Sequence, residues 1–410
     1  MRQPARRLSS RNVLLLMCGA ELLSMTGFAT YPALLPVLRA EWVLSNSQAG
    51  LISGIFFAGY MAATPVLVGL TDRIDARRIY LLATALAFAG SLGFALFARD
   101  LLSAMVFQAM VGAGLAGTYM PGLRLLTDHF HGTTPSRAVA FYTATFGLGT
   151  TGSLLLAGAF EPLGWTWAFA AASIGPIVAG LLVLFSFPAR PVQSSGTTPA
   201  KFFDFRPVVR NREAMGYILG YTVHCWELFG LRSWLPAFFA FSLGLTATQG
   251  GFWFGASALA AWINMIGPLA SIFGNEVAVR RGRKSVVLAV MAASGILACL
   301  VGFSASLPII VVFILMSLYF LLVMGDSAAL TAGLVAAAES GRKGVSMALH
   351  SLMGFGAGFL APLAFGLVLD ATGGNESVTA WGFAFAALGA WSLLVVLFTL
   401  LRRRNKSEAV

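Results

Sequence analysis

The sequence has little charge. Only 10% of its 410 residues are Asp, Glu, Lys or Arg, whereas soluble domains carry about 25%. Hydrophobic residues make up 58% of the chain, and the mean hydropathy is +0.82. So few charges cannot cover a water-facing surface, and apolar runs long enough to span a bilayer recur along the whole chain. The composition therefore excludes a soluble globular protein and predicts an integral membrane protein.

Cysteine and the sequence motifs of enzymes are also scarce. The three cysteines, Cys18, Cys225 and Cys299, all fall in apolar segments, which argues against a disulfide framework. The His-Phe-His run at 129–131 has no cysteine or further histidine nearby, so it is a poor metal site. The phosphate-binding pattern GxxxxGK[ST] is absent, which excludes ATP as the energy source. We therefore expect no metal, no cofactor and no enzymatic activity.

The basic residues are distributed unevenly. The chain has 27 Lys and Arg against 16 Asp and Glu, but they gather in short loops and form no broad basic face, which argues against nucleic acid as a partner. All but Arg39, Arg99 and Arg232 lie on one side of the predicted spans. The positive-inside rule then predicts a bacterial-type inner (plasma) membrane protein, embedded in the lipid bilayer, with both termini cytoplasmic.

The apolar runs predict an all-α membrane protein with twelve transmembrane helices. A polar segment at 188–213, rich in Pro, Ser, Thr and basic residues, is predicted to be a cytoplasmic linker between an N-terminal six-helix bundle at 1–187 and a C-terminal one at 214–410. The predicted spans are 13–38, 46–70, 79–98, 101–126, 138–160, 165–187, 214–241, 248–273, 285–304, 308–332, 344–369 and 378–401.

The two predicted halves look related to each other. SQAG at 47–50 opens the second span and TQGG at 248–251 opens the eighth, while WAFA at 167–170 and WGFA at 381–384 begin the sixth and the twelfth. These matches recur in the same order at a similar offset. They predict two parallel repeats of six helices, related by a pseudo-two-fold axis along the membrane normal.

The loop after the second span carries a recognisable motif. GLTDRIDARR at 69–78 resembles the signature G-x-L-x-D-R-x-G-R-R of the major facilitator superfamily, and its residues Asp72, Arg73, Arg77 and Arg78 match the signature. The resemblance extends over nearly the whole chain, without identifying a subfamily. It implies the two-bundle fold of that superfamily and alternating access. It also implies that this loop holds the cytoplasmic side closed, as a latch. The alternative is that the arginines only set the orientation of the chain in the membrane.

The second half repeats the loop motif as GNEVAVRRGRK at 274–284. Arg280, Gly282 and Arg283 match the signature, but Val279 takes the place of its aspartate. The fifth span, FGLGTTGSLLLAG at 146–158, has the glycines of the family antiporter motif but not its proline. This departure counts against drug-type proton antiport without excluding it.

Few ionisable residues fall inside the spans, and each is a candidate for function. A charge at the bilayer centre costs about 2.5–3.5 kcal/mol on insertion scales, so such residues face protein or water. His224 and Glu227 are three residues apart, which places them on one face of the seventh helix, where they can share a proton. The alternative is that each bonds to a neighbouring helix. Arg232 favours a carboxylate-bearing solute.

Other candidates are Glu21 in the first helix and Asp326 in the tenth. The family resemblance places these helices around a central cavity, so that Glu21 would face Glu227. Asp326 could bind a proton, form part of a gate, or make a bond that packs two helices. For His350 and Arg124, too, the sequence allows either a functional or a structural role. Aromatic residues can line the cavity or simply pack; the candidates are Tyr31, Tyr119, Tyr221 and Trp226.

Together these features predict a monomeric secondary active transporter. It would couple the movement of protons to that of a small organic solute, through Glu21, His224, Glu227, Arg232 and Asp326. The first alternative is multidrug or metabolite efflux by proton antiport, in which the carboxylates bind lipophilic cations. A weaker alternative is a membrane enzyme or a non-transporting sensor, which would need a catalytic cluster or a partner domain that the sequence does not show.

The predicted latch leads to a test at Asp72. Replacing Asp72 with Ala should weaken the cytoplasmic latch and shift the ratio of inward-facing to outward-facing protein. Labelling of single cysteines placed on the periplasmic side measures that ratio. Labelling that is unchanged in the Ala variant would contradict the latch.

Overall fold

The structure, a computed structural model, describes residues 9–71, 73–130, 135–189, 204–246, 255–339 and 342–407. Within these ranges the chain forms helices and turns and no β-strand, which confirms the predicted all-α class. In the same part of the chain, eleven helical segments are long and apolar enough to cross a membrane. A multi-pass membrane architecture is therefore confirmed.

The chain divides into two compact units. The first unit consists of Met1–Leu38 and Ile55–Thr197, and the second of Arg39–Gly54 and Thr198–Val410. The sequence places residues 39–54 in the N-terminal bundle, whereas their contacts group them with the second unit. The long helix α3 is therefore shared, with its first nine residues in the second unit and the rest in the first.

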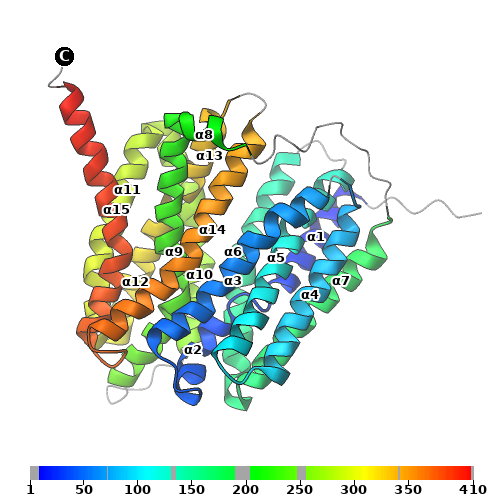
Figure 1. Ribbon diagram of the computed structural model, residues 1–410, viewed down its shortest axis with the longest axis horizontal. Helices are drawn as coiled ribbons and strands as arrows, with labels where there is room; N and C mark the ends of the chain where they lie inside the picture. The colour runs from blue at the N-terminus through cyan, green and yellow to red at the C-terminus, as the bar shows by residue number, and fades with distance from the viewer. Residues whose placement is uncertain are drawn as a thin grey trace, which may run out of the picture. The chain divides into compact units, whose positions relative to one another are not determined.

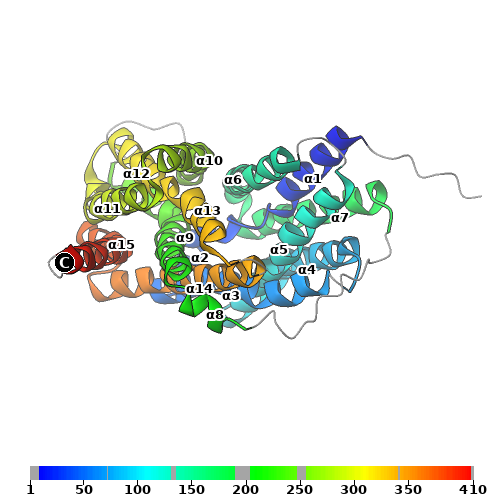
Figure 2. The ribbon, with the colours of Figure 1, turned by 90° about the horizontal axis from the view of Figure 1, so that it is seen from above.

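The first unit packs around α1 and α4. Figure 2 shows α4 beside α5 and α7, and α1 lies against α5, α6 and α7. The helices of the N-terminal part of the chain are α1 (Ser10–Ser24), α2 (Thr30–Glu41), α3 (Asn46–Leu70), α4 (Ala76–Phe97), α5 (Leu101–His129), α6 (Pro135–Phe160) and α7 (Trp165–Ser186).

The second unit is built around α9. This helix packs against α10, α12, α13, α14 and α15 (Figures 1 and 2) and is the most buried of the candidate spans. The helices of this part of the chain are α8 (Arg206–Arg210), α9 (Arg212–Thr246), α10 (Ala256–Arg281), α11 (Arg283–Val301), α12 (Ile309–Gly325), α13 (Ser327–Ala337), α14 (Lys343–Ala371) and α15 (Val378–Ser407).

The first turns of α3 belong to the second unit because α14 holds them. The carboxylate of Asp370 accepts hydrogen bonds from the backbone N–H groups of Asn46 and Ser47, at 3.0 and 2.8 Å, and from the side-chain amide of Asn46 at 2.9 Å. A carboxylate is favourable at a helix N-terminus, whose N–H groups lack partners in the helix. Gly50 lets the helices meet closely, since a Cβ there would collide with the carbonyl of Pro362.

The predicted first span, 13–38, is not one continuous helix. It is interrupted by a turn over residues 25–29, between α1 and α2. The break is stabilised from α6, where the Ser153 hydroxyl accepts from the N–H of Ala29 at 2.9 Å and donates to the carbonyl of Thr26 at 2.6 Å. A broken helix is tolerated at membrane depth when neighbouring groups satisfy the freed backbone in this way.

The predicted tenth span, 308–332, is interrupted as well. α12 ends at Gly325 and α13 begins at Ser327, so Asp326 lies in the junction. Gly274 of α10 packs closely there, because a Cβ at Gly274 would collide with the carbonyl oxygen of Gly325. Thus each unit contains an interrupted helix, and the second interruption carries an acidic residue.

The break in the first span predicts a stability effect at Ser153. Replacing Ser153 with Ala leaves the buried Ala29 N–H without its acceptor, which should lower the free energy of unfolding by about 1–3 kcal/mol. Unfolding of the purified protein in detergent measures the loss. Thr127→Ala is the control, because that exposed hydroxyl bonds within its own helix. Equal stability of the two variants would contradict the assigned role of Ser153.

Candidate functional site

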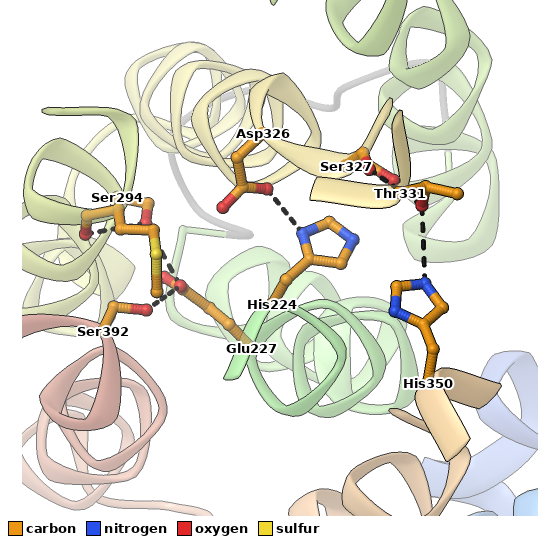
Figure 3. A network of polar contacts seen from close by, with 9 residues as sticks. His224, Glu227, Ser294, Asp326, Ser327, Thr331, His350 and Ser392 are labelled. Atoms are coloured by element: carbon orange, nitrogen blue, oxygen red, sulfur yellow. Dashed lines mark hydrogen bonds and ion pairs between the residues drawn. The ribbon is translucent and has the colours of Figure 1, made fainter. Parts of the chain in front are cut away.

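The three candidate residues of α9 are all buried. His224 is 3% exposed, Glu227 2% and Arg232 9%. Because α9 lies at the centre of the second unit, side chains three residues apart can reach different neighbouring helices. Figure 3 shows that His224 and Glu227 do so, since their side chains extend toward separate groups of partners. The predicted direct pairing of His224 with Glu227 is therefore wrong.

His224 pairs instead with Asp326. Its Nδ1 lies 2.7 Å from Oδ1 of Asp326, in the junction between α12 and α13 (Figure 3). The two side chains are 2% and 5% exposed. The imidazole and the carboxylate are thus in close electrostatic contact, although their geometry is not that of a hydrogen bond. The contact joins α9 to the interruption of the predicted tenth span.

Glu227 is held by hydroxyl groups. Its Oε2 accepts hydrogen bonds from Ser392 of α15 at 2.7 Å and from Ser294 of α11 at 3.1 Å (Figure 3). Its Oε1 is buried and has no hydrogen-bond partner among the residues that the structure describes. Tyr319 of α12 also faces the carboxyl. The carboxyl thus lies among neutral hydroxyl donors.

His350 of α14 completes a polar network around α9. Its ring stacks on Tyr221, with the ring centroids 3.6 Å apart, and its Nε2 lies 3.5 Å from the hydroxyl of Thr331 on α13. Tyr221 also stacks on His224, at 5.6 Å between centroids. The network therefore connects α14 and α13 with the His224–Asp326 pair through the aromatic ring of Tyr221.

Arg232 lies further along α9. Its Nε donates to Oδ1 of Asn264 on α10 at 3.0 Å, and its guanidinium carbon lies 5.6 Å from the ring centroid of Phe320 on α12. A cation over an aromatic face is stabilised by the quadrupole of the ring. The positive charge is thus held between three helices of the second unit.

Glu21 occupies a comparable setting in the first unit. It is 0% exposed, and its Oε2 accepts from the hydroxyl of Tyr142 on α6 at 3.0 Å and from Ser24 at 3.4 Å. Its Oε1 is buried, again with no hydrogen-bond partner in the described residues. The prediction that Glu21 faces Glu227 concerns both units together and stays a prediction.

The predicted cavity aromatics have different surroundings. Tyr31 is 1% exposed and packs edge-on against Phe94, and Tyr119 stacks on Tyr142. Trp226 lies edge-on to Trp391 of α15, whose side chain is 51% exposed. Tyr221 alone among the four contacts the histidines described above.

Several partners were missed at the sequence level. Ser294, Ser392, Tyr142 and Asn264 bind the candidate charges, yet each is a single polar residue in an apolar run. Such residues are common in membrane helices, where their hydroxyls often bond to their own backbone. The sequence therefore gives no signal that separates them from other serines and tyrosines.

Comparison with known proteins places the chain in a family. Residues 17–280 match the family model described as Major Facilitator Superfamily. The chain belongs to this superfamily. Among curated proteins it is 24% identical to protein spinster homolog 3 of Danio rerio, over 54% of the chain and 46% of the relative. It is 25% identical to an uncharacterized MFS-type transporter of Enterobacter sp. strain 638, over 70% of the chain and 73% of the relative.

Solved structures share the fold of this superfamily member. A bacterial homolog of the human lysosomal transporter Spinster, in an inward-facing and unoccupied conformation, aligns with a TM-score of 0.72 at 18% identity, covering 97% of this chain and 96% of the other. The xylose transporter XylE from E. coli aligns with a TM-score of 0.71 at 15% identity, over 95% and 97%. These likenesses confirm the major-facilitator fold.

The chain spans 63%, 37% and 46% of the first three curated relatives it matches.

The signature loop of the superfamily is only partly described. Asp72 lies outside the described residues. Arg73 and Arg78 are exposed, while Nη2 of Arg77 donates to the carbonyl of Leu184 on α7 at 2.7 Å. Arg77 thus fastens α4 to α7 within the first unit. The latch itself stays a prediction.

The second copy of the loop motif joins α10 to α11. Gly282 has a φ of +94°, a left-handed conformation that favours glycine, which explains the match to the signature. Arg280 forms an exposed ion pair with Glu276, at 2.7 Å. Arg124, in the first unit, donates to Thr71 at 2.7 Å and lies 3.9 Å from Asp128, which is a long contact.

The buried His224–Asp326 pair can be measured by a double-mutant cycle. His224→Gln, Asp326→Asn and the double variant should give a coupling energy of about 1–3 kcal/mol, because each single change leaves a buried polar partner behind. Unfolding in detergent gives the free energies of unfolding of the wild type and of the three variants, and the coupling energy follows from these four values.

The exposed Arg280–Glu276 pair is the matched control. Its side chains are 74% and 56% exposed, and such pairs contribute roughly 0–1 kcal/mol. Coupling energies that are equal in the two cycles would show that the His224–Asp326 contact is not formed as described.

Proposed function

We propose that this superfamily member is a secondary active transporter that moves a small organic solute across the inner membrane by alternating access, driven by coupling to protons. The fold and the family match support transport. The coupling rests on one observation, the setting of Glu227, a buried carboxyl that receives only hydroxyl donors from the described residues around it.

The hydroxyls around Glu227 can serve both protonation states. The Ser294 hydroxyl oxygen lies 3.1 Å from Oε2 of Glu227 and 3.2 Å from the carbonyl of Met291. When the carboxyl is ionised, Ser294 donates to it. When it is protonated, Ser294 can turn to the Met291 carbonyl and its oxygen can accept from the carboxylic acid. A group that must bind and release a proton needs partners that adapt in this way.

Asp326 and His224 have a different proposed role. The pair connects α9, which carries Glu227, to the interruption between α12 and α13. Discontinuous helices form the solute and ion sites of many secondary transporters. We therefore place the solute near this interruption, where protonation of Glu227 can change the packing of α9.

Arg232 extends the proposal to the class of solute. Its charge lies on the same helix as Glu227, five residues further on, and favours a solute that carries a carboxylate. The aligned structures include one described as a nucleoside transporter and one described as a xylose transporter, which supports a polar metabolite as the solute.

The first experiment identifies the solute. The purified chain is screened by thermal shift at two pH values against carboxylic acids, sugars, nucleosides and lipophilic cationic drugs. Stabilisation by a polar metabolite supports the proposal. Stabilisation by lipophilic cations alone would instead support multidrug efflux by proton antiport.

The coupling prediction is tested at Glu227. With the identified solute in proteoliposomes, Glu227→Gln should abolish accumulation driven by a pH gradient but leave counterflow exchange, because the amide can neither bind nor release the proton. The control is Glu161→Gln, which changes an exposed carboxyl in the short 3-10 helix Glu161–Leu163 after α6 and should behave as wild type. Undiminished accumulation in Glu227→Gln would reject the assignment.

A further inference from the structure

We propose that Glu21 is a second proton-binding site, contained within the first unit, so that each solute moves with two protons. This inference rests on the proposed proton coupling at Glu227 and adds its stoichiometry.

The carboxyls of Glu21 and Glu227 have matching environments. In each, Oε2 accepts two hydroxyl hydrogen bonds: from Tyr142 and Ser24 for Glu21, and from Ser294 and Ser392 for Glu227. In each, Oε1 is buried without a hydrogen-bond partner among the described residues. Each lies on the first membrane helix of its half of the chain. The match indicates that both carboxyls serve the same chemistry.

Tyr142 can adapt to either protonation state of Glu21. Its hydroxyl oxygen lies 3.0 Å from Oε2 of Glu21 and also 3.0 Å from the carbonyl oxygen of Tyr119. When Glu21 is ionised, Tyr142 donates to the carboxylate. When Glu21 binds a proton, the new O–H donates to the Tyr142 oxygen, and the Tyr142 hydrogen turns to the Tyr119 carbonyl. Proton uptake therefore leaves no hydroxyl unsatisfied, as at Ser294 beside Glu227.

Among the residues that the structure describes, the titratable groups facing Glu21 supply no positive charge. All are thiol or phenol groups, which are neutral in the range where a carboxyl normally titrates. An uncompensated carboxylate is costly at membrane depth, so we infer that the cation taken up here is a proton. The facing titratable groups are Cys18 of α1, Tyr60 of α3, Tyr80 of α4, Tyr119 of α5 and Tyr142 of α6.

The end of α1 adds to this preference. α1 ends at Ser24, and the backbone N–H of Met25 bonds to the carbonyl of Glu21. A helix C-terminus carries a partial negative charge, which favours a cation beside it. Glu21 thus lies one turn before a negative helix end at the interruption of the first span, a position where transporters coordinate coupling ions.

The experiment measures the number of protons per solute. In proteoliposomes containing the full chain and the identified solute, the pH gradient that just balances a known solute gradient gives the ratio. We expect two protons for wild type and for Glu161→Gln, and one for Glu21→Gln. A ratio of one in wild type, or of two that persists in Glu21→Gln, would overturn the inference. No response of wild type to a pH gradient would instead overturn the proposed function.

A second measurement does not depend on transport. Infrared difference spectra of the purified protein, taken between high and low pH, report the C=O stretch of protonated carboxyls. Glu21→Gln and Glu227→Gln should each remove a different band, and Glu21→Asp should restore a shifted one. Size-exclusion chromatography confirms that each variant is folded. A folded Glu21→Gln variant with an unchanged spectrum would show that Glu21 does not exchange a proton.

Discussion

The cost of leaving a polar group unsatisfied in hydrocarbon is the constraint on which this structure depends. A backbone or side-chain polar group inside the bilayer has no water to bond with, so it costs free energy unless a partner within the protein satisfies it. At the interruption of the first span Ser153 supplies both a donor and an acceptor. The same constraint explains why Arg232 lies against an amide and an aromatic ring rather than toward lipid.

This constraint is most demanding where each unit has an interrupted helix with a buried acid nearby. In the first unit Glu21 lies one turn before the break, and in the second Asp326 lies in the break itself. The two acids have different neighbours: Asp326 lies 2.7 Å from the imidazole of His224, whereas Glu21 accepts hydrogen bonds from hydroxyls only. A carboxyl beside an imidazole has a neighbour that can carry positive charge, whereas a carboxyl among hydroxyls does not.

The sequence was sufficient for the architecture but not for the partners in the site. Hydropathy and the loop motif predicted the all-α membrane class and the superfamily, because each depends on local composition. The breaks were missed because Gly27 and Gly325 resemble many other glycines that membrane helices tolerate. The partners of His224 and Glu227 could not be predicted either, since i, i+3 spacing fixes the face of a helix but not the neighbouring helices that pack against it.

The side chains of His224 and Glu227 extend in different directions, and this affects how proton binding could be coupled to solute movement. The two residues are three positions apart on one continuous helix of 35 residues. His224 contacts Asp326 in the α12–α13 junction, whereas Glu227 accepts hydrogen bonds from α11 and α15. Under the proposed coupling, a proton that binds Glu227 changes contacts on one side of α9, while the helix interruption lies on another side. Because close-packed interiors transmit strain, a small shift of α9 reaches His224 and Asp326 without any proton passing between the residues. In the proposed mechanism α9 is thus the mechanical link between protonation and the solute site.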